Sequence, residues 1–415
     1  MAILTSGVGL TNAITTRYTS KYQRAAKVRR LYDQLAVPVG ASQFDLETRR
    51  GMGSTYTFNF ASDMTPGSTP ISETVDIIPQ ILRDATSTIT PTSRGEGLKW
   101  SQLMDLSAYT DFVAIRAEKI GENAMETIDN LAKAAALQGS LAVYGNMAAS
   151  HNTRATLDAG TATDNWTEAN LWRVATMAQD LRCPPYIDAQ GQKSFIAIGH
   201  PDTYYDLFHG GNVVSAALYS GINPSNPLFN GELGSIAGFK LLISPWAKVF
   251  GGAGAVNGTG DTGLTYTVTA GGTALSVSMT VTTGTNNAYG RLLTVGTKET
   301  ANTHYDTNER ISRIAGTTTL TFVGSGANGG LRFDHAITDY VNNADSVYPV
   351  VYGTPGSLVK VYANEVGEYG EMVGPLEDGL AHQWQSLAWK FFGGVGRIAE
   401  NYCMRGEYSS SLDAW

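Results

Sequence analysis

The sequence predicts an α+β fold into which an all-β domain is inserted, and three observations carry this prediction. Residues 111–138 have apolar side chains at helical spacing over a length that is unusual for a domain helix. Residues 166–244 alternate between amphipathic and uniformly apolar stretches, as helices and buried strands do. Residues 251–346 are rich in threonine and glycine, and core-type sequence resumes after them, so this block is an insertion.

The composition favours an oligomeric protein. The chain has 415 residues, enough for two or three domains, and only 16% of them are charged, while 46 are glycine. A chain with so few charges is expected to have much of its surface covered by partners. The net charge of −8 argues against a dedicated nucleic-acid-binding protein.

Residues 1–50 are expected to form an extended arm that ends in a short helical segment around Thr16–Leu35. Residues 1–30 contain no acidic side chain, and their basic residues recur at three- and four-residue intervals. Such an arm suits a contact with DNA or with an acidic neighbouring subunit, and a solvated basic tail is the alternative. The basic residues are Arg17, Lys21, Arg24, Lys27, Arg29 and Arg30.

Residues 51–107 predict two strands that reach out and return around a long tip. Thr55–Phe60 alternates polar and aromatic residues, Asp63–Pro79 is polar and rich in proline, and Ile81–Thr92 returns to β-type residues. So little apolar material cannot offset the entropy of ordering an independent core. A two-stranded hairpin of this length is marginal alone, so it is expected to lie on another copy of the chain.

The stretch 111–138 is the clearest helix, with Asp111 as a possible cap and Gly139 at its end. At the rise of an α-helix it is about 40 Å long, which suits a structural strut. Its apolar stripe consists of Val113, Ala117, Ile120, Ala124, Ile128, Leu131 and Ala135.

The rest of the chain predicts an α/β core interrupted by the insertion. Residues 166–182 and the stretch that opens at Asp202 are expected to be helices, with Thr167 and Asp202 as caps. Within the insertion, two alternating stretches around Gly271–Gly272 predict a hairpin. The expected strands of the core are Ser194–Gly199, Phe239–Ser244, Val347–Tyr352, Leu358–Tyr362, Gln383–Ile398 and Asn401–Tyr408.

No pattern in the sequence predicts catalysis, a cofactor or a metal. Two glycine patterns, beginning at Gly258 and Gly324, match a dinucleotide fingerprint but lack the helix and second parallel strand that it requires. A metal held by His200, Asp202, Asp206 and His209 is a weak alternative. Aromatic side chains that are better explained by packing than by base stacking are Trp100, Trp384, Trp389, Phe391 and Phe392.

The cysteines and the first residues predict where the protein is made. Cys183 and Cys403 lie far apart in the sequence, which suits a reducing compartment without a disulfide framework. The N-terminus lacks the basic region of a signal peptide, and no stretch approaches the roughly 18 apolar residues of a membrane span. We therefore expect a cytoplasmic product without a membrane partner.

Four stretches of the sequence resemble one family, the N-four-type major capsid proteins of tailed phages. They are the run from Ile71 to Tyr144 and the segments FIAIGHPDTYYDLF, NPLFNGELGSIAGFKLLISP and SLAWKFFGGVGRIAENYCMRGE. The resemblance covers most of the chain outside the first 50 residues and the insertion. It implies the Hong Kong 97-type phage capsid fold, with an N-arm, an E-loop, a spine helix, and peripheral and axial domains.

The resemblance also implies a division of the chain. Residues 1–50 would be the N-arm and 51–107 the E-loop. The peripheral domain with the spine helix would comprise 108–184 and 381–415, and the axial domain 185–250 and 347–380, with the inserted β-domain at 251–346. The E-loop residues expected to contact another subunit are Tyr56, Phe58, Phe60, Ile71, Ile77 and Ile78.

The function implied is structural and not enzymatic. The chain would assemble with itself into pentamers and hexamers that form an icosahedral shell around double-stranded DNA, held without sequence specificity. Its further partners would be a portal protein, a scaffolding protein and possibly a decoration protein, and it would end in the virion after assembly in the host cytoplasm. An encapsulin-type nanocompartment is the alternative, and a surface adhesin is disfavoured by the missing secretion signal.

Overall fold

The computed structural model describes residues 31–40, 55–62, 64, 66, 81–101, 112–145, 153–158, 164–187, 193–209, 232–254, 265–270, 276, 278–281, 292–296, 309–315, 319–324, 330–335, 340–342, 345–354, 356–363, 367–378 and 383–413. The chain divides into two compact units, and each contains segments from distant parts of the sequence. Unit 1 comprises Met1–Ala132 and Leu358–Ile398, and unit 2 comprises Lys133–Ser357 and Ala399–Trp415.

Unit 1 is built on a five-stranded sheet whose central strand is β19 (Trp384–Arg397). One half of β19 pairs with β17 (Leu358–Tyr362), which continues to β1 (Ala36–Gly40) in a parallel ladder. The other half lies between β18 (Glu371–Asp378) and β4 (Thr92–Ser101), both antiparallel to it. The sequence predicted β19 and β17 as strands, and the structure confirms both.

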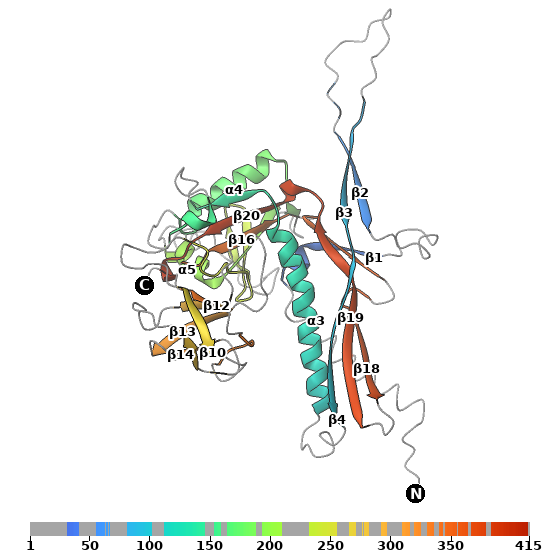
Figure 1. The fold of residues 1–415 in the computed structure, drawn as a ribbon. Helices are drawn as coiled ribbons and strands as arrows, with labels where there is room; N and C mark the ends of the chain where they lie inside the picture. The colour runs from blue at the N-terminus through green and yellow to red at the C-terminus, as the bar shows by residue number, and fades with distance from the viewer. Residues whose placement is uncertain are drawn as a thin grey trace, which may run out of the picture. The chain divides into compact units, whose positions relative to one another are not determined.

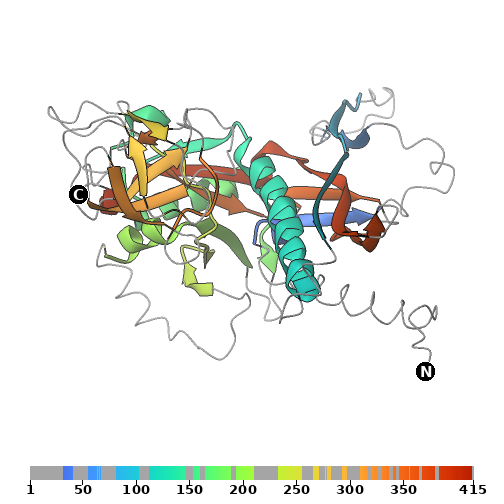
Figure 2. The ribbon, with the colours of Figure 1, turned by 60° about the horizontal axis from the view of Figure 1, so that its bottom comes forward.

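The long helix α3 (Phe112–Leu137) covers one face of this sheet (Figures 1 and 2). Its bounds agree with the predicted helix 111–138, and five residues of the predicted apolar stripe, from Ala117 to Leu131, pack on the sheet. The side chain of Val113 lies outside the described residues. Trp389 on β19 also donates from its indole Nε1 to Asn123 Oδ1 at 2.9 Å. The cluster between α3 and the sheet contains Trp100, Ala117, Ile120, Ala124, Ile128, Met372, Leu387, Trp389 and Phe391.

A separate two-stranded ribbon belongs to unit 1. It consists of β2 (Tyr56–Ala61) and β3 (Asp84–Ile89), paired antiparallel from Tyr56 opposite Ile89 to Ala61 opposite Asp84. The predicted outward and returning strands are therefore confirmed. Figure 1 shows β3 running on into β4, so the ribbon is the extension of a sheet strand.

Unit 2 contains a seven-stranded mixed sheet in which β20 (Cys403–Tyr408), β16 (Tyr348–Gly353), β7 (Lys193–Gly199) and β9 (Phe239–Ile243) are the inner strands. Its edges are β5 (Ala142–Tyr144) and β8 (Glu232–Ile236), and the short β6 (Tyr186–Ile187) pairs with β7. Two helices, α4 (Glu168–Asp180) and α5 (Pro201–His209), contribute side chains to the core of this unit. Short 3-10 turns lie at Asp33–Leu35, Arg154–Thr156, Glu400–Tyr402 and Ser411–Asp413.

The core of unit 2 contains buried aromatic side chains whose polar atoms form hydrogen bonds with one another. The indole of Trp166 donates to the hydroxyl of Tyr352 at 2.9 Å, and the Tyr352 and Tyr408 hydroxyls lie 2.9 Å apart. Tyr204 of α5 donates to backbone carbonyls of β7 and β9. Because an unmade hydrogen bond is costly in a core, this network fixes how α5 and β16 pack.

Within residues 251–346 the structure contains a closed antiparallel barrel of six strands. They follow the order β10 (Thr265–Ala270), β11 (Ser278–Val281), β14 (Thr319–Val323), β13 (Glu309–Ala315), β12 (Leu292–Gly296) and β15 (Tyr340–Asn342). The predicted hairpin around Gly271–Gly272 corresponds to β10 and β11. At the base of the barrel, Phe250 and Val347 exchange backbone hydrogen bonds of 2.8 and 3.0 Å, so the chain enters and leaves side by side.

Two strands pair differently from the grouping expected from the sequence. Leu358–Tyr362, expected in the axial group, pairs with β19, the strand expected in the peripheral group. Cys403–Tyr408, expected beside β19, instead pairs with β16 and β5. The reason is that the chain crosses between the sheets after Ser357 and again after Ile398. Proximity in sequence does not reveal such crossings.

Candidate assembly surfaces

The root of the β2–β3 ribbon packs on its own sheet. Ile89 is buried against Val359 and Val361 of β17, and Tyr56 and Phe58 pack partly buried against the same cluster. Ser87 Oγ also donates to the Arg397 carbonyl at 3.1 Å. These contacts fix where the ribbon leaves the sheet.

Two glycines of β19 make room for this root. A Cβ atom on Gly396 would lie 2.6 Å from Ile89 Cγ1, and one on Gly394 would lie 3.0 Å from the Thr90 carbonyl oxygen. Real Cβ contacts are not found at the first of these distances and are rare at the second, so a side chain at either position would require the ribbon root to shift.

We expect Gly396→Ala to lower the free energy of unfolding by about 1–3 kcal/mol, because the added methyl overpacks against Ile89. In an Ile89→Ala background the same substitution should cost little, since the colliding atoms are gone. Urea unfolding of the two single variants and the double variant measures this coupling. Additive effects would show that the ribbon root is not seated on Gly396.

Beyond its root, the ribbon has apolar side chains that are exposed to solvent. Ile81 is 91% exposed and Leu82 is 52% exposed on the approach to β3, and Met64 is 62% exposed near the end of β2. A two-stranded ribbon has no core in which to bury them. Contiguous exposed apolar residues of this kind mark an interaction surface.

The residues predicted for intersubunit contact fall into two groups. Tyr56 and Phe58 lie at the root and pack against their own chain. Ile71, Ile77 and Ile78 and the side chain of Phe60 lie outside the described residues. The exposed pair Ile81 and Leu82 was not singled out from the sequence, although an adjacent Ile and Leu after a proline-rich stretch could have drawn attention to it.

The sheet of unit 1 has a second face that α3 does not cover. Along β19 the side chains alternate, with Leu387, Trp389 and Phe391 buried and Trp384 exposed. Trp384 is 45% exposed with the Lys99 ammonium 5.7 Å from its ring. The packing expected for Trp100, Trp389 and Phe391 is confirmed, whereas Trp384 lies at the surface.

The start of the described chain is fastened inside unit 1 by charged groups. Lys360 is fully buried and donates to both carboxylate oxygens of Asp33, at 2.8 and 2.9 Å, and to Glu368 at 2.9 Å. The Asp129 carboxylate of α3 accepts the backbone N–H groups of Leu31 and Asp33 at 3.1 and 3.0 Å. The backbone at Leu31 is therefore held at a fixed point on α3. The predicted basic residues Arg17, Lys21, Arg24, Lys27, Arg29 and Arg30 lie outside the described residues.

In unit 2 a second set of buried charges joins segments far apart in sequence. Arg154 donates from Nε and Nη2 to the two carboxylate oxygens of Glu407, at 2.8 and 2.6 Å. Arg405 Nε lies 2.7 Å from Glu407 Oε1, and Arg405 also donates to the Leu137 carbonyl at the end of α3. The Arg154 guanidinium rests 3.5 Å from the centre of the Phe250 ring, where the chain enters the insertion. This cluster ties the base of the barrel to β20.

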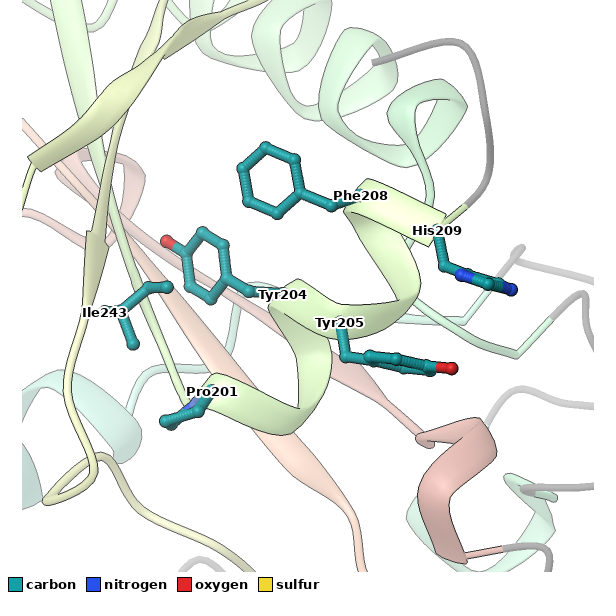
Figure 3. A pocket seen from close by; sticks show the side chains of 6 residues that line it. All are labelled: Pro201, Tyr204, Tyr205, Phe208, His209 and Ile243. Carbon is teal, nitrogen blue, oxygen red and sulfur yellow. The ribbon is translucent and has the colours of Figure 1, made fainter. Parts of the chain in front are cut away.

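Helix α5 borders an open pocket of about 390 Å³ (Figure 3). Tyr205 and His209 stack on each other with ring centres 5.2 Å apart, one helical turn from each other. The pocket lining is aromatic and apolar, without a convergent set of polar groups. It is formed by Pro201, Tyr204, Tyr205, Phe208, His209 and Ile243.

The acidic residues of α5 make hydrogen bonds that do not resemble a metal site. Asp202 lies in the first turn of α5 and not before it, and it accepts the Tyr348 hydroxyl at 3.0 Å. The Asp206 carboxylate accepts hydrogen bonds from the backbone N–H of Ser411, at 3.1 Å, and from the Ser411 hydroxyl. Burial raises the pKa of the Asp206 carboxyl. Among the described residues, no three His, Cys, Asp or Glu side chains are grouped to hold a metal ion, and no helix could cross a membrane.

The fold is that of phage capsid proteins. No protein-family model and no curated protein matches the chain. Among solved structures, the capsid of Ralstonia phage GP4 is similar with a TM-score of 0.54 and 11% identity, over 91% of this chain and 87% of that one. The capsid of cyanophage P-SCSP1u has a TM-score of 0.50 at 11% identity, over 92% and 88% of the two chains.

A third similar structure, the cyanophage Pam1 capsid asymmetric unit, has a TM-score of 0.50 and 14% identity, over 92% of this chain and 93% of that one. At such identities the likeness is one of fold. It confirms the Hong Kong 97-type architecture that the sequence resemblance implied.

Proposed function

We propose that this protein is a major capsid protein that assembles with itself into the icosahedral shell of a tailed phage. The observation that carries the proposal is the fold shared with three phage capsid structures over 91–92% of the chain. The exposed ribbon supports it, because Ile81 and Leu82 are apolar side chains that the described part of their own chain leaves exposed.

In this proposal the ribbon of each subunit lies across a neighbouring subunit, and the chain before Leu31 makes a second contact. Each contact is small, but symmetry repeats it in every subunit, and a closed shell holds all of them at once. The ion pair of Asp33 with Lys360 holds the chain at one point of unit 1, and the packing of Ile89 holds the base of the ribbon at another.

The proposed partners follow from a shell that is filled with DNA. They are other copies in pentamers and hexamers, a portal protein, a scaffolding protein, a possible decoration protein and double-stranded DNA bound without sequence specificity. The protein would assemble in the host cytoplasm and remain in the virion. Its role is structural, and we propose no catalytic step.

The test is to express the full chain alone and together with the product of the upstream neighbouring gene, and to examine both by negative-stain microscopy and sedimentation. We expect closed particles tens of nanometres wide in at least one preparation. A monomer in both would contradict the proposal. Particles that enclose a cargo enzyme in the native host, with no portal or terminase gene nearby, would favour the encapsulin alternative.

A further inference from the structure

The inserted barrel is joined to the rest of unit 2 by a narrow stem of two chain segments. Phe250 and Val347 are paired through their backbones, and the backbone N–H of Gly254 donates to the Asp345 carbonyl at 2.9 Å. A two-stranded connection is marginally stable by itself, and domains joined in this way move relative to each other unless a further contact holds them. The stem alone therefore does not fix the orientation of the barrel.

The loop that follows β9 places an aromatic side chain at the surface of the core of unit 2. The backbone N–H of Ser244 donates to the Gly199 carbonyl at the end of β7, at 3.1 Å. Two residues later, the backbone N–H of Trp246 donates to Ser244 Oγ at 3.1 Å, and the Trp246 carbonyl accepts Lys133 Nζ, near the end of α3, at 3.2 Å. The backbone of Trp246 is thus held by the core, while the residue remains 39% exposed.

A segment of the barrel meets this indole. Residues 330–335 lie between β14 and β15, and the backbone N–H of the fully buried Leu331 donates to the carbonyl of Ser276, between β10 and β11, at 2.8 Å. The next residue, Arg332, has its guanidinium carbon 4.3 Å from the centre of the Trp246 ring and 4.7 Å from that of Phe333. Tryptophan is the strongest cation–π partner among the side chains, and arginine can also stack on it with its planar face.

We propose that Arg332 and Trp246 form a latch that holds the inserted barrel in one orientation on the core of unit 2. Because the latch joins the barrel to the core outside the stem, the barrel can swing about the stem only when this contact breaks. Every copy of the chain then presents the surface of its barrel in the same direction. The inference concerns a single subunit and does not depend on the proposed shell.

Pulsed electron paramagnetic resonance on the full-length subunit tests the latch. One nitroxide label is attached at Val323→Cys, a half-exposed position of β14, and the other at Gln179→Cys, an exposed position of α4. The native cysteines, Cys183 and Cys403, are both buried. We expect a narrow distribution of label-to-label distances in the otherwise unchanged chain. With Arg332→Ala added, the distribution should become about twice as wide or more, because the barrel then samples the orientations that its stem allows.

Three further variants separate the latch from a general effect on the fold. Arg332→Lys keeps the charge but loses the planar stacking, so its distribution should have an intermediate width. Trp246→Leu should widen the distribution as much as Arg332→Ala, and combining the two should add nothing further, since both remove the same contact. The control is Lys193→Ala, which removes an exposed cation at the start of β7 and should leave the width unchanged.

Three results would overturn the proposal. They are a distribution that is already wide with the latch intact, equal widths with and without Arg332, and widening by Arg332→Ala that persists in full in the Trp246→Leu background. The last result would mean that Arg332 holds the barrel through groups other than the indole.

Discussion

Replacing both Ile81 and Leu82 with serine is expected to abolish closed particles while the isolated subunit keeps its melting temperature. Ile81 is 91% exposed and Leu82 is 52% exposed in the single chain, so their loss removes little that stabilises the subunit. In the proposed shell both would be buried against a neighbour. Burying such a side chain contributes about 1.5–3 kcal/mol, and the loss would recur at every subunit contact.

Particle yield by sedimentation and microscopy, together with thermal unfolding of the unassembled subunit, checks this expectation. The control is Ile187→Ser with Val323→Ser, which removes two apolar side chains that are 67% and 50% exposed on unit 2. Particles formed by the Ile81 and Leu82 variant at the parental yield would show that the ribbon is not the assembly contact. A lowered melting temperature in that variant would place these side chains in the subunit's own packing.

Glu407→Gln is expected to be the most destabilising of the single substitutions considered. The Glu407 side chain is fully buried and faces two guanidinium groups, those of Arg154 and Arg405. Without its charge, two buried cations repel each other with no anion between them. Breaking a buried ion pair from one side costs about 3–5 kcal/mol, and the loss should appear as a lower midpoint in urea unfolding.

The comparison for this experiment is Glu400→Gln. Glu400 is exposed and accepts hydrogen bonds from the Ser140 backbone N–H and hydroxyl at 3.1 and 3.2 Å. Both are accepted by Oε2, and the amide oxygen of a glutamine can accept both in its place, so we expect a change below about 1 kcal/mol. If both variants unfolded at the parental urea concentration, the Arg154–Glu407–Arg405 cluster would not hold β20 in place.

Local patterns in the sequence predicted the elements well. The apolar stripe gave α3 to within one residue at each end, and uniformly apolar stretches gave β7 and β9. These three predictions are correct because helical spacing and the complete burial of a strand depend on side chains that are neighbours in the sequence. The family resemblance then gave the architecture that the three capsid structures confirm.

Strand partners and long-range contacts could not be predicted in this way. Lys360 lies 327 residues from Asp33 and meets it in the core, and no local pattern links the two. Gly394 and Gly396 look like part of a glycine-rich strand, whereas the structure shows that they make room for Ile89. Alternation in Thr55–Phe60 predicted a strand, but which of its aromatic residues pack on their own chain depends on a sheet formed some 300 residues later.

The crossing of the chain between the two units has a consequence for synthesis. The sheet of unit 1 lacks its central strand until β19 has been made, and the sheet of unit 2 lacks an inner strand until β20 has been made. A polypeptide truncated before Trp384 therefore completes neither sheet, and one truncated between β19 and β20 completes the sheet of unit 1 alone. Such truncated subunits cannot present the finished fold that an assembling partner would have to recognise.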